Sequence, residues 1–327
     1  MNKTWAIRFH EIGDPDRLRW EQVDVPDPGP GEVRIRNTAI GVNMKEIGER
    51  SGAYPCPSLP AIPGIEAAAV VLKAGAGVTE LVPGDRVGYA TMPTGSYCQE
   101  RVLAADRLVK LPADIDDITI AAGLHKGMTA RYLVRKTYAV RQGDTVLVHA
   151  AAGGTGLIIC QWAKHLGAIV IGTVSSHAKA EVARAHGCDF PIVYTEEDFV
   201  ARVKAITGGA GLPVVYDSVG KDTFTKSLDC LDELGIMVLY GIASGHPPPL
   251  ELMKFDIWKS YFYTRPSFFV HTRKHEDLLA SAWDLFNVIR SGAVKIEVHA
   301  QFPLKDAAAA HRAVESRQTT GSVVLIP

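Results

Sequence analysis

Apolar and polar residues alternate along the first part of the chain in the manner of short β-strands. Residues 32–36 change side at every position, and residues 67–72 are apolar on both faces. Proline and glycine at 28–31 and 83–85 mark turns between such runs. Strands that are interrupted this often predict a partly open β-barrel over about the first 110 residues.

From Ile118 the pattern changes, because helical segments begin to alternate with compact β-branched runs. The predicted strands are residues 145–149, 169–173, 190–194, 214–217 and 236–240. We expect Thr195 to cap the helix between the third and fourth strands, with Asp198 as its third residue, and glycines 208–209 to end it. Such strand, helix and strand units predict a doubly wound parallel sheet.

The end of the chain adds a helix over 274–291 and a last strand over 321–326 with no helix after it. This strand is therefore expected to return to the first domain. The resulting domains are residues 1–125, 126–266 and 267–327, the first and third forming one discontinuous domain.

Composition narrows the class of protein. Of the 327 residues, 47% are hydrophobic and 22% are charged, which is typical of globular proteins. The 35 basic and 36 acidic residues nearly cancel, so the net charge produces no electrostatic field that would attract nucleic acid or an anionic membrane. The five cysteines lack zinc-site spacing and are expected to be reduced thiols. No apolar run is long enough to cross a bilayer, and the N-terminus has no pattern of a signal peptide. We expect a cytoplasmic protein.

A glycine-rich turn carries the clearest candidate chemistry. Residues 149–156 read His-Ala-Ala-Ala-Gly-Gly-Thr-Gly between a predicted strand and a predicted helix. Small residues let the backbone turn tightly and approach a pyrophosphate, which the helix N-terminus favours electrostatically. The alternative is an ordinary tight turn, which the second strand about twenty residues further on makes less favoured. The candidate cofactor residues here are Gly153, Gly154, Thr155 and Gly156.

The end of the next strand indicates which dinucleotide binds. Sites that prefer NAD usually place an acid there to hold the ribose 2′-hydroxyl, and residues 171–179 contain none. Ser175 and Ser176 can donate hydrogen bonds to a 2′-phosphate and Lys179 can neutralise it, so NADPH is favoured. Alternatively, Lys179 is only a solvated residue in the first turn of a helix.

Several segments together resemble the quinone oxidoreductases of the zeta-crystallin type, in the zinc-independent branch of the medium-chain dehydrogenase/reductase superfamily, and most of all the bacterial members. They follow the family order over nearly the whole chain: residues 39–43, 51–55, 82–87, 126–130, 150–156, 215–220 and 321–322. The resemblance implies a Rossmann doubly wound parallel sheet inserted into a GroES-like β-barrel domain, an NADPH cleft between the two, and usually a homodimer.

The resemblance also assigns cofactor contacts. Asn43 with Met44, Lys45 and Glu46 is expected near the nicotinamide, Lys126 and Tyr132 along the domain boundary, and Tyr194 with Ser175 and Lys179 at the adenosine end. Val219, Ser244, Gly245, Phe268 and Arg317 would line the rest. Simple packing is an equal alternative for Val219 and Phe268.

The same comparison predicts that no zinc is bound. Zinc-dependent relatives have Cys shortly after a Gly-Val pair and His before Glu, where this chain has Asn43 and Ile65. Family members often carry Asn-x-x-Asp where this chain has Asn43 and Glu46, so the local hydrogen bonds are expected to differ.

A quinone is easily reduced, either by single electrons or by a hydride from nicotinamide C4, so orienting it against the nicotinamide and excluding water is most of the catalytic task. Tyr54 is the candidate to stack on or hydrogen-bond the quinone, with a loop anchor as its alternative role, and Asn43 is the candidate to polarise the carbonyl. His125 and His149 are interpreted as structural.

Two other functions stay open. The first is reduction of a conjugated C=C bond, for which we find no proton relay in the sequence. The second is an NADPH-sensing RNA-binding or structural role, against which the charge balance argues.

Overall fold

The computed structural model describes residues 2–56, 58–251, 253 and 256–327. The chain forms two compact units. The first takes the chain up to Lys126 together with Thr272–Phe286 and Ile296–Pro327, and the second comprises Gly127–His271 and Asn287–Lys295. The domain limits expected at residues 125 and 266 fall near two of these divisions and stay predictions. Nothing in the sequence pattern predicts that Asn287–Lys295 belongs to the second unit.

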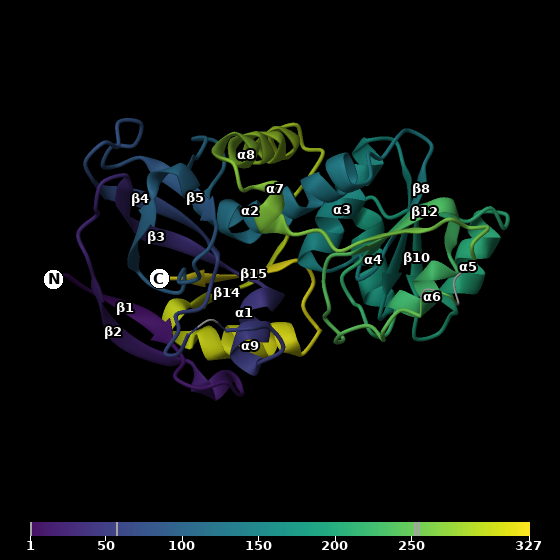
Figure 1. Cartoon of the computed structure of the whole chain (residues 1–327), viewed down its shortest axis with the longest axis horizontal. Coiled ribbons are helices and arrows are strands. Elements are labelled where there is room, and N and C mark those ends of the chain that lie inside the picture. Colours follow the sequence, from purple (N-terminus) through teal and green to yellow (C-terminus); the bar gives the residue numbers. More distant parts are fainter. Residues whose placement is uncertain (1, 57, 252, 254–255) are drawn as a thin grey trace. The chain divides into compact units, whose positions relative to one another are not determined.

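The first unit contains a seven-stranded sheet with the order β14-β15-β3-β4-β5-β7, and β6 pairs with β3 (Figure 1). A separate antiparallel pair is formed by β1 (Asn2–Arg8) and β2 (Arg19–Val25). The strands of the larger sheet are β3 (Glu32–Val42), β4 (Glu66–Ala74), β5 (Arg86–Ala90), β6 (Glu100–Ala104), β7 (Val109–Lys110), β14 (Val298–Pro303) and β15 (Ser322–Ile326). Because β15 pairs antiparallel with β3, the C-terminal strand returns to the first unit as expected.

The core of the first unit lies between this sheet and its helices. Ile35, Ile40, Val71 and Leu325 from the strands are fully buried there. Two short helices pack on each other: α1 (Met44–Ser51) and α9 (Ala307–Glu315). Helices α2 (Asp117–Tyr132) and α8 (His275–Arg290) each begin in the first unit and end in the second. Short 3-10 turns lie at Pro15–Arg17, Ala105–Arg107 and Leu304–Asp306.

The second unit is a parallel sheet of six strands with the order β10-β9-β8-β11-β12-β13. Its strands are β8 (Thr145–Val148), β9 (Ile169–Val174), β10 (Phe190–Val193), β11 (Leu212–Asp217), β12 (Leu231–Leu239) and β13 (Phe262–Thr264). Their neighbours pair in parallel throughout. From β8 the chain adds β9 and β10 on one side, and it then returns to add β11, β12 and β13 on the other side. The point where the strand order reverses, the topological switch point, therefore lies between β8 and β11.

Helices connect these strands: α3 (Gly154–His165), α4 (His177–Ala185), α5 (Phe199–Ile206) and α6 (Phe224–Leu228). A π-helical turn at Leu133–Thr137 precedes the first strand of the unit, and the short helix α7 (Phe268–His271) follows its last strand. In a parallel sheet whose strand order reverses direction at β8, right-handed crossovers put helices on both faces. The doubly wound fold expected from the sequence is therefore confirmed. Within the part of the chain described, no helix is long and apolar enough to cross a membrane.

Two local expectations need correction. The N-cap expected at Thr195 is wrong, because α5 begins at Phe199 and Asp198 caps it, accepting the amide hydrogens of Val200 (2.8 Å) and Ala201 (3.3 Å). A carboxylate also interacts favourably with the helix dipole, which a hydroxyl does not. The short sixth strand β13 was not expected, since its three residues are too few to show a pattern.

Candidate active site

The turn after the central strand β8 is shaped by its glycines. A Cβ atom at Gly156 would lie 2.2 Å from the carbonyl oxygen of Ala150, and Ala150 itself has a left-handed φ of 53°. Gly153 precedes α3 as its N-cap and has no side chain to accept hydrogen bonds from the first turn. The N-terminal amides of α3 thus present their donors and positive dipole end to an anion, as a pyrophosphate requires.

The candidate cofactor residues of the second unit follow the carboxyl ends of five neighbouring strands. Gly153 and Gly154 follow β8, Ser175 and Ser176 follow β9, Tyr194 follows β10, Val219 follows β11, and Ser244 and Gly245 follow β12. In open parallel sheets ligands bind at this edge, beside the switch point. The fold places these residues along one edge although they span about a quarter of the chain.

The segments after β9 and β10 are joined to each other. The amide of Tyr194 donates to the carbonyl of Val174 (3.1 Å), and the hydroxyl of Ser176 accepts the amide hydrogen of Lys179 (3.4 Å) and caps α4. A hydroxyl that accepts one hydrogen bond can still donate its own hydrogen to another group. Partial burial lowers the pKa of Lys179. A dianionic phosphate is a suitable partner for this half-buried ammonium group.

The loops after β11 and β12 are also tied together. The carbonyl of Val219 accepts hydrogen bonds from the amide and the hydroxyl of Ser244, both at 2.8 Å. Buried Asp217 at the end of β11 accepts the amide hydrogens of Val219 (2.7 Å) and Gly220 (3.1 Å). Sequence reasoning missed Asp217, which fixes the loop that carries the candidate contacts.

Tyr132 and Phe268 are both buried in the second unit. The ring of Tyr132 stacks on His271, with ring centres 4.3 Å apart, and the ring of Phe268 meets Phe269 edge to face at 5.4 Å. Packing accounts for both aromatic side chains, so their proposed cofactor contacts rest on the resemblance alone.

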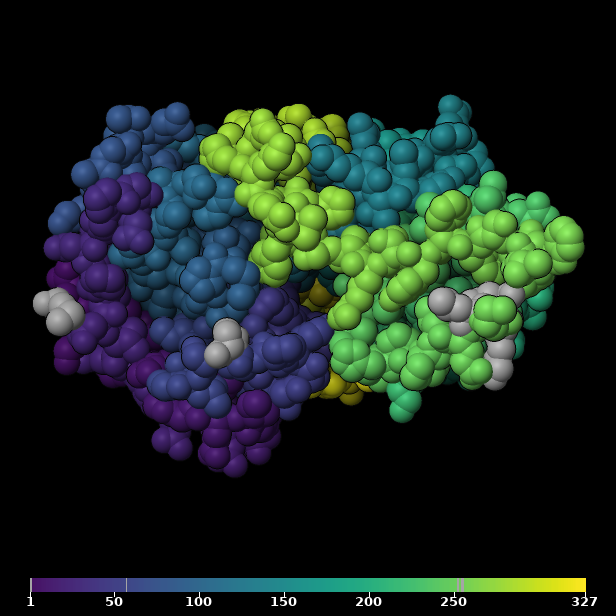
Figure 2. All heavy atoms as spheres, viewed as in Figure 1, coloured from purple at the N-terminus to yellow at the C-terminus, as the bar shows by residue number. Residues whose placement is uncertain are grey.

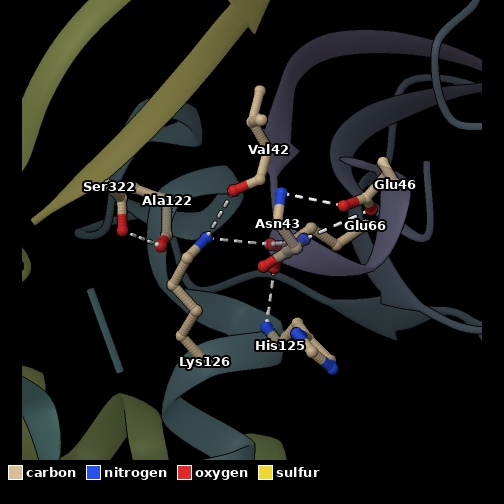
Figure 3. Close-up of polar contacts among 8 residues, drawn as sticks. All are labelled: Val42, Asn43, Glu46, Glu66, Ala122, His125, Lys126 and Ser322. Atoms are coloured by element: carbon tan, nitrogen blue, oxygen red, sulfur yellow. Dashed lines mark hydrogen bonds and ion pairs between the residues drawn. The ribbon is translucent and has the colours of Figure 1, made fainter. Parts of the chain in front are cut away.

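A buried polar cluster occupies the first unit, where β3 meets α1 and α2 (Figure 3). Glu66 lies at its centre and is completely buried. Its carboxylate accepts hydrogen bonds from the side-chain amide of Asn43 (2.8 Å) and the backbone amide of His125 (2.7 Å), and the ammonium of Lys126 lies 3.3 Å away. Lys126 also donates to the carbonyl of Val42 (3.2 Å).

Glu46 adds a second buried carboxyl to this cluster. The backbone amide of Asn43 donates to it at 2.8 Å, and the Asn43 side chain lies between Glu46 and Glu66. Burial raises the pKa of Glu46 to about 7, and the nearby negative charge of Glu66 adds to this effect. Two carboxyls thus lie near one buried ammonium group, and Glu46 is partly protonated near neutral pH.

The other candidates of the first unit lie outside this cluster's hydrogen bonds. Lys45 forms an ion pair with Glu49, and Met44 is exposed. The Tyr54 ring packs directly on α1, since a Cβ atom at Gly48 would lie 2.0 Å from it. Arg317 is exposed, after α9, with a left-handed φ of 58°. The geometry of Tyr54 agrees with its alternative role as a loop anchor.

Comparisons with known proteins decide the family. A model described as alcohol dehydrogenase GroES-like domain matches residues 29–142, and one described as zinc-binding dehydrogenase matches residues 154–286. The chain is 46% identical to a quinone oxidoreductase of Pseudomonas aeruginosa, covering 98% of this chain and 99% of the relative. The chain belongs to the quinone oxidoreductase family.

Two further relatives are informative. The structure of Escherichia coli quinone oxidoreductase in complex with NADPH matches with a TM-score of 0.96 and 45% identity, covering 99% of this chain and all of that one. A 2-haloacrylate reductase from a Burkholderia species is 47% identical, with 98% of each chain covered. The resemblance and the fold class inferred from the sequence are therefore confirmed.

One of the matching family models is described as zinc-binding, but the polar cluster of this chain does not have the ligands of a zinc site. Asn43 and Ile65 stand where zinc-dependent relatives are expected to have ligands. Among the described residues no three His, Cys, Asp or Glu side chains gather closely enough to hold a metal ion. Instead, the ammonium of Lys126 is the cation beside Glu66.

The perturbed carboxyl of Glu46 makes the stability of the protein depend on pH. Because the pKa of Glu46 rises from 4.5 to about 7 on folding, its contribution to stability is complete below pH 4.5 and is lost as the pH rises through 7. Glu46→Gln keeps an oxygen for the Asn43 amide without the charge. We expect the variant to gain about 3 kcal/mol over wild type between pH 5 and pH 8, as an upper bound.

The measurement is the free energy of unfolding in urea at both pH values. Glu80→Gln, at an exposed glutamate of the same unit, is the control and should show no such gain. A gain for Glu46→Gln that is the same at both pH values would contradict the assignment.

Proposed function

We propose that this chain is an NADPH-dependent oxidoreductase that reduces quinones without a metal ion. The observation that carries the proposal is the carboxyl edge of the second unit's sheet, where the glycine turn, Ser176 and Lys179 lie and where β9 ends without an acid. The full-length likeness to a quinone oxidoreductase solved with NADPH supports it. NADPH, when bound, supplies a hydride to the acceptor.

The residues of this chain supply binding, orientation and charge. Gly153, Gly154, Thr155 and Gly156 are proposed to hold the pyrophosphate at the N-terminus of α3. Ser175, Ser176, Lys179 and Tyr194 are proposed to hold the adenosine end, with Lys179 facing the 2′-phosphate. Val219, Ser244 and Gly245 form the tied loops beside the switch point. Asn43 and the buried cluster around it are proposed to serve the acceptor.

A second acceptor class is supported by one specific finding. The relative named 2-haloacrylate reductase acts, by its name, on a conjugated C=C bond, and it is as similar to this chain as the quinone oxidoreductases are. Reduction of such a bond needs a proton as well as a hydride, and the cluster around Glu66 contains protons that the sequence pattern alone did not indicate.

The test is NADPH oxidation with 1,2-naphthoquinone, 1,4-benzoquinone, 2-chloroacrylate and 1-octen-3-one offered separately, and with NADH as control. Turnover of the quinones with NADPH and little with NADH is expected. Turnover of the C=C acceptors alone would replace the quinone assignment, and tight NADPH binding without any turnover would refute an enzymatic role with these acceptors.

We also propose that the chain is a homodimer formed through the edge of the second unit's sheet. Strand β13 ends the sheet, and large apolar side chains near it are exposed: Trp258 (83%), Ile257 (79%) and Phe262 (56%). The segment around β13 is coloured green in Figure 2, where it lies at the surface. An exposed apolar edge strand favours pairing with a second copy.

Phe262→Glu is therefore expected to convert the dimer to a monomer in analytical ultracentrifugation. Val82→Glu, at an exposed apolar residue of the first unit, is the control and should stay dimeric. A wild-type monomer, or a Phe262→Glu dimer of unchanged affinity, would refute the proposed interface.

All five cysteines are free thiols, which suits the reducing cytoplasm that we propose as the location.

A further inference from the structure

The proposed reaction needs a group that acts on the acceptor, and the glycine turn and its neighbours supply only contacts to the cofactor. Adding a hydride to a quinone or an enone places negative charge on the carbonyl oxygen of the acceptor, and a proton must follow. A group that carries positive charge and a transferable proton serves both needs. The cluster in the first unit is where the described residues gather such groups (Figure 3).

Most members of the cluster are unsuited to this role. Glu66 is fully buried, and both its oxygens already accept hydrogen bonds, from Asn43 on one side and His125 on the other. Glu46 is also fully buried and is bound to the backbone of Asn43. Burial lowers the pKa of His125 to about 4, which leaves its ring neutral at pH 7. The Tyr54 ring is packed on α1.

Lys126 differs from these residues in three respects. It brings the cluster's positive charge, and although it is buried it keeps 7% of its surface exposed, as Asn43 does, whereas Glu46 and Glu66 have none. Its position is fixed, because the Val42 carbonyl and the Glu66 carboxylate hold its ammonium group at 3.2 and 3.3 Å. An ammonium has three N–H donors, so these two contacts leave one for another acceptor.

We propose that Lys126 is a catalytic residue whose ammonium group binds the carbonyl oxygen of the acceptor and gives it the proton that follows the hydride. The proposal rests on the reductase function above. Glu66 is a positioning residue that holds Lys126, and Gly41 makes room for it, since a Cβ atom there would lie 2.4 Å from the Glu66 carboxylate.

The step balances as follows. The hydride brings two electrons and one hydrogen to the acceptor, and one N–H bond of Lys126 breaks as an O–H bond forms on the acceptor oxygen. A quinone becomes the hydroquinone in this way. An enone becomes the enol, which takes a proton from water on its α-carbon and loses the O–H proton to give the saturated ketone. The neutral amine then takes a proton from solvent water. The second carboxyl, Glu46, limits the negative charge around the amine because burial raises its pKa to about 7 and keeps it partly protonated.

Three variants test the proposal. Lys126→Met removes charge and proton, and Lys126→Arg keeps a charge but its guanidinium does not give up a proton. Lys126→Met with Glu66→Gln removes both charges, so that the Glu66 carboxylate is not left buried without its cation. Lys73→Met, at an exposed lysine that pairs with Asp27, is the matched control. Circular dichroism and thermal unfolding identify the variants that fold.

We expect Lys126→Met and the double variant to lower kcat with 1-octen-3-one about 30-fold and with 1,2-naphthoquinone about threefold, because the less reactive acceptor depends more on stabilisation of its oxygen. Lys126→Arg should stay nearer wild type with the quinone than with the enone. The dissociation constant of NADPH, measured by fluorescence, should change by less than threefold. Equal losses with both acceptors, or an NADPH affinity that falls more than tenfold, would overturn the proposal and leave Lys126 with the cofactor contact that the family resemblance assigns to it.

A binding measurement without turnover keeps this test separate from the proposed function. The complex with NADP⁺ is mixed with 4-nitrophenol, whose phenolate resembles the charged oxygen and absorbs at longer wavelength. Wild type and Lys126→Arg should stabilise the phenolate, and Lys126→Met should not. If wild type gives no phenolate, the proposal fails even where NADPH oxidation is rapid. If NADPH oxidation is absent but the phenolate forms, the proposed function fails and the contact with Lys126 stands.

Discussion

Gly156→Ala is expected to abolish NADPH binding and to destabilise the second unit. A methyl group at this position would lie 2.2 Å from the carbonyl oxygen of Ala150 and 3.0 Å from the Cα of Ala151. Both neighbours are backbone, so neither can rotate away, and Ala150 already has an unfavourable positive φ. The helix α3 would have to move off the sheet. We expect a loss of about 3 kcal/mol in the free energy of unfolding.

The effect on the cofactor should be larger than stability alone explains. The amides at the start of α3 bind a pyrophosphate only when they converge on it, and a displaced helix loses several charge-assisted hydrogen bonds at once. The affinity for NADPH, measured by calorimetry on the folded fraction, should fall at least 100-fold, which corresponds to about 3 kcal/mol.

Gly153→Ala is the matched control within the same turn. A Cβ atom at Gly153 would lie 3.2 Å from the same Ala150 oxygen, which a shift of a few tenths of an ångström relieves. Its loss of stability should be below about 1 kcal/mol. If Gly156→Ala binds NADPH within threefold of wild type, the turn after β8 is not the pyrophosphate site.

The parts of the fold that the sequence predicts well are those that depend on local pattern. Apolar runs and glycine spacing, each within about ten residues of sequence, indicate the strands β8, β9 and β11 and the turn at Gly153. The N-cap of α5 was misplaced because Thr195 and Asp198 are both good capping residues, and the choice between them depends on the path of the chain.

The cluster around Glu66 could not be predicted in the same way. Asn43 caps α1, Glu66 begins β4 and Lys126 lies in α2, and hydrogen bonds between them join residues 23 and 60 positions apart. No spacing along the chain encodes such contacts, because sheet pairing and helix packing create them. The family resemblance pointed to Asn43 and Lys126 as site residues. Glu66 was considered only as the neighbour of Ile65, which stands where zinc-dependent relatives have a histidine ligand.

Lys179→Ala is expected to remove most of the preference for NADPH over NADH. Lys179 lies in the first turn of α4, beside the Ser176 hydroxyl that accepts its backbone amide hydrogen, so alanine keeps the cap and the helix. A charge-assisted contact to a phosphate contributes about 1.5–3 kcal/mol. The value of kcat/KM for NADPH should therefore fall about 50-fold, while that for NADH, which lacks the 2′-phosphate, should change less than twofold.

A second lysine of the same unit distinguishes this contact from a general loss of positive charge. Lys164 on α3 is exposed and pairs with Asp189 at 2.6 Å, away from the end of β9, and Lys164→Ala should leave both values near wild type. Raising the salt concentration should narrow the preference of wild type but not that of Lys179→Ala, because salt weakens a charge contact that only wild type can make. Equal losses for NADPH and NADH would mean that Lys179 supports the fold rather than the 2′-phosphate, and the preference for NADPH would then have to come from Ser175, Ser176 and the absence of an acid after β9.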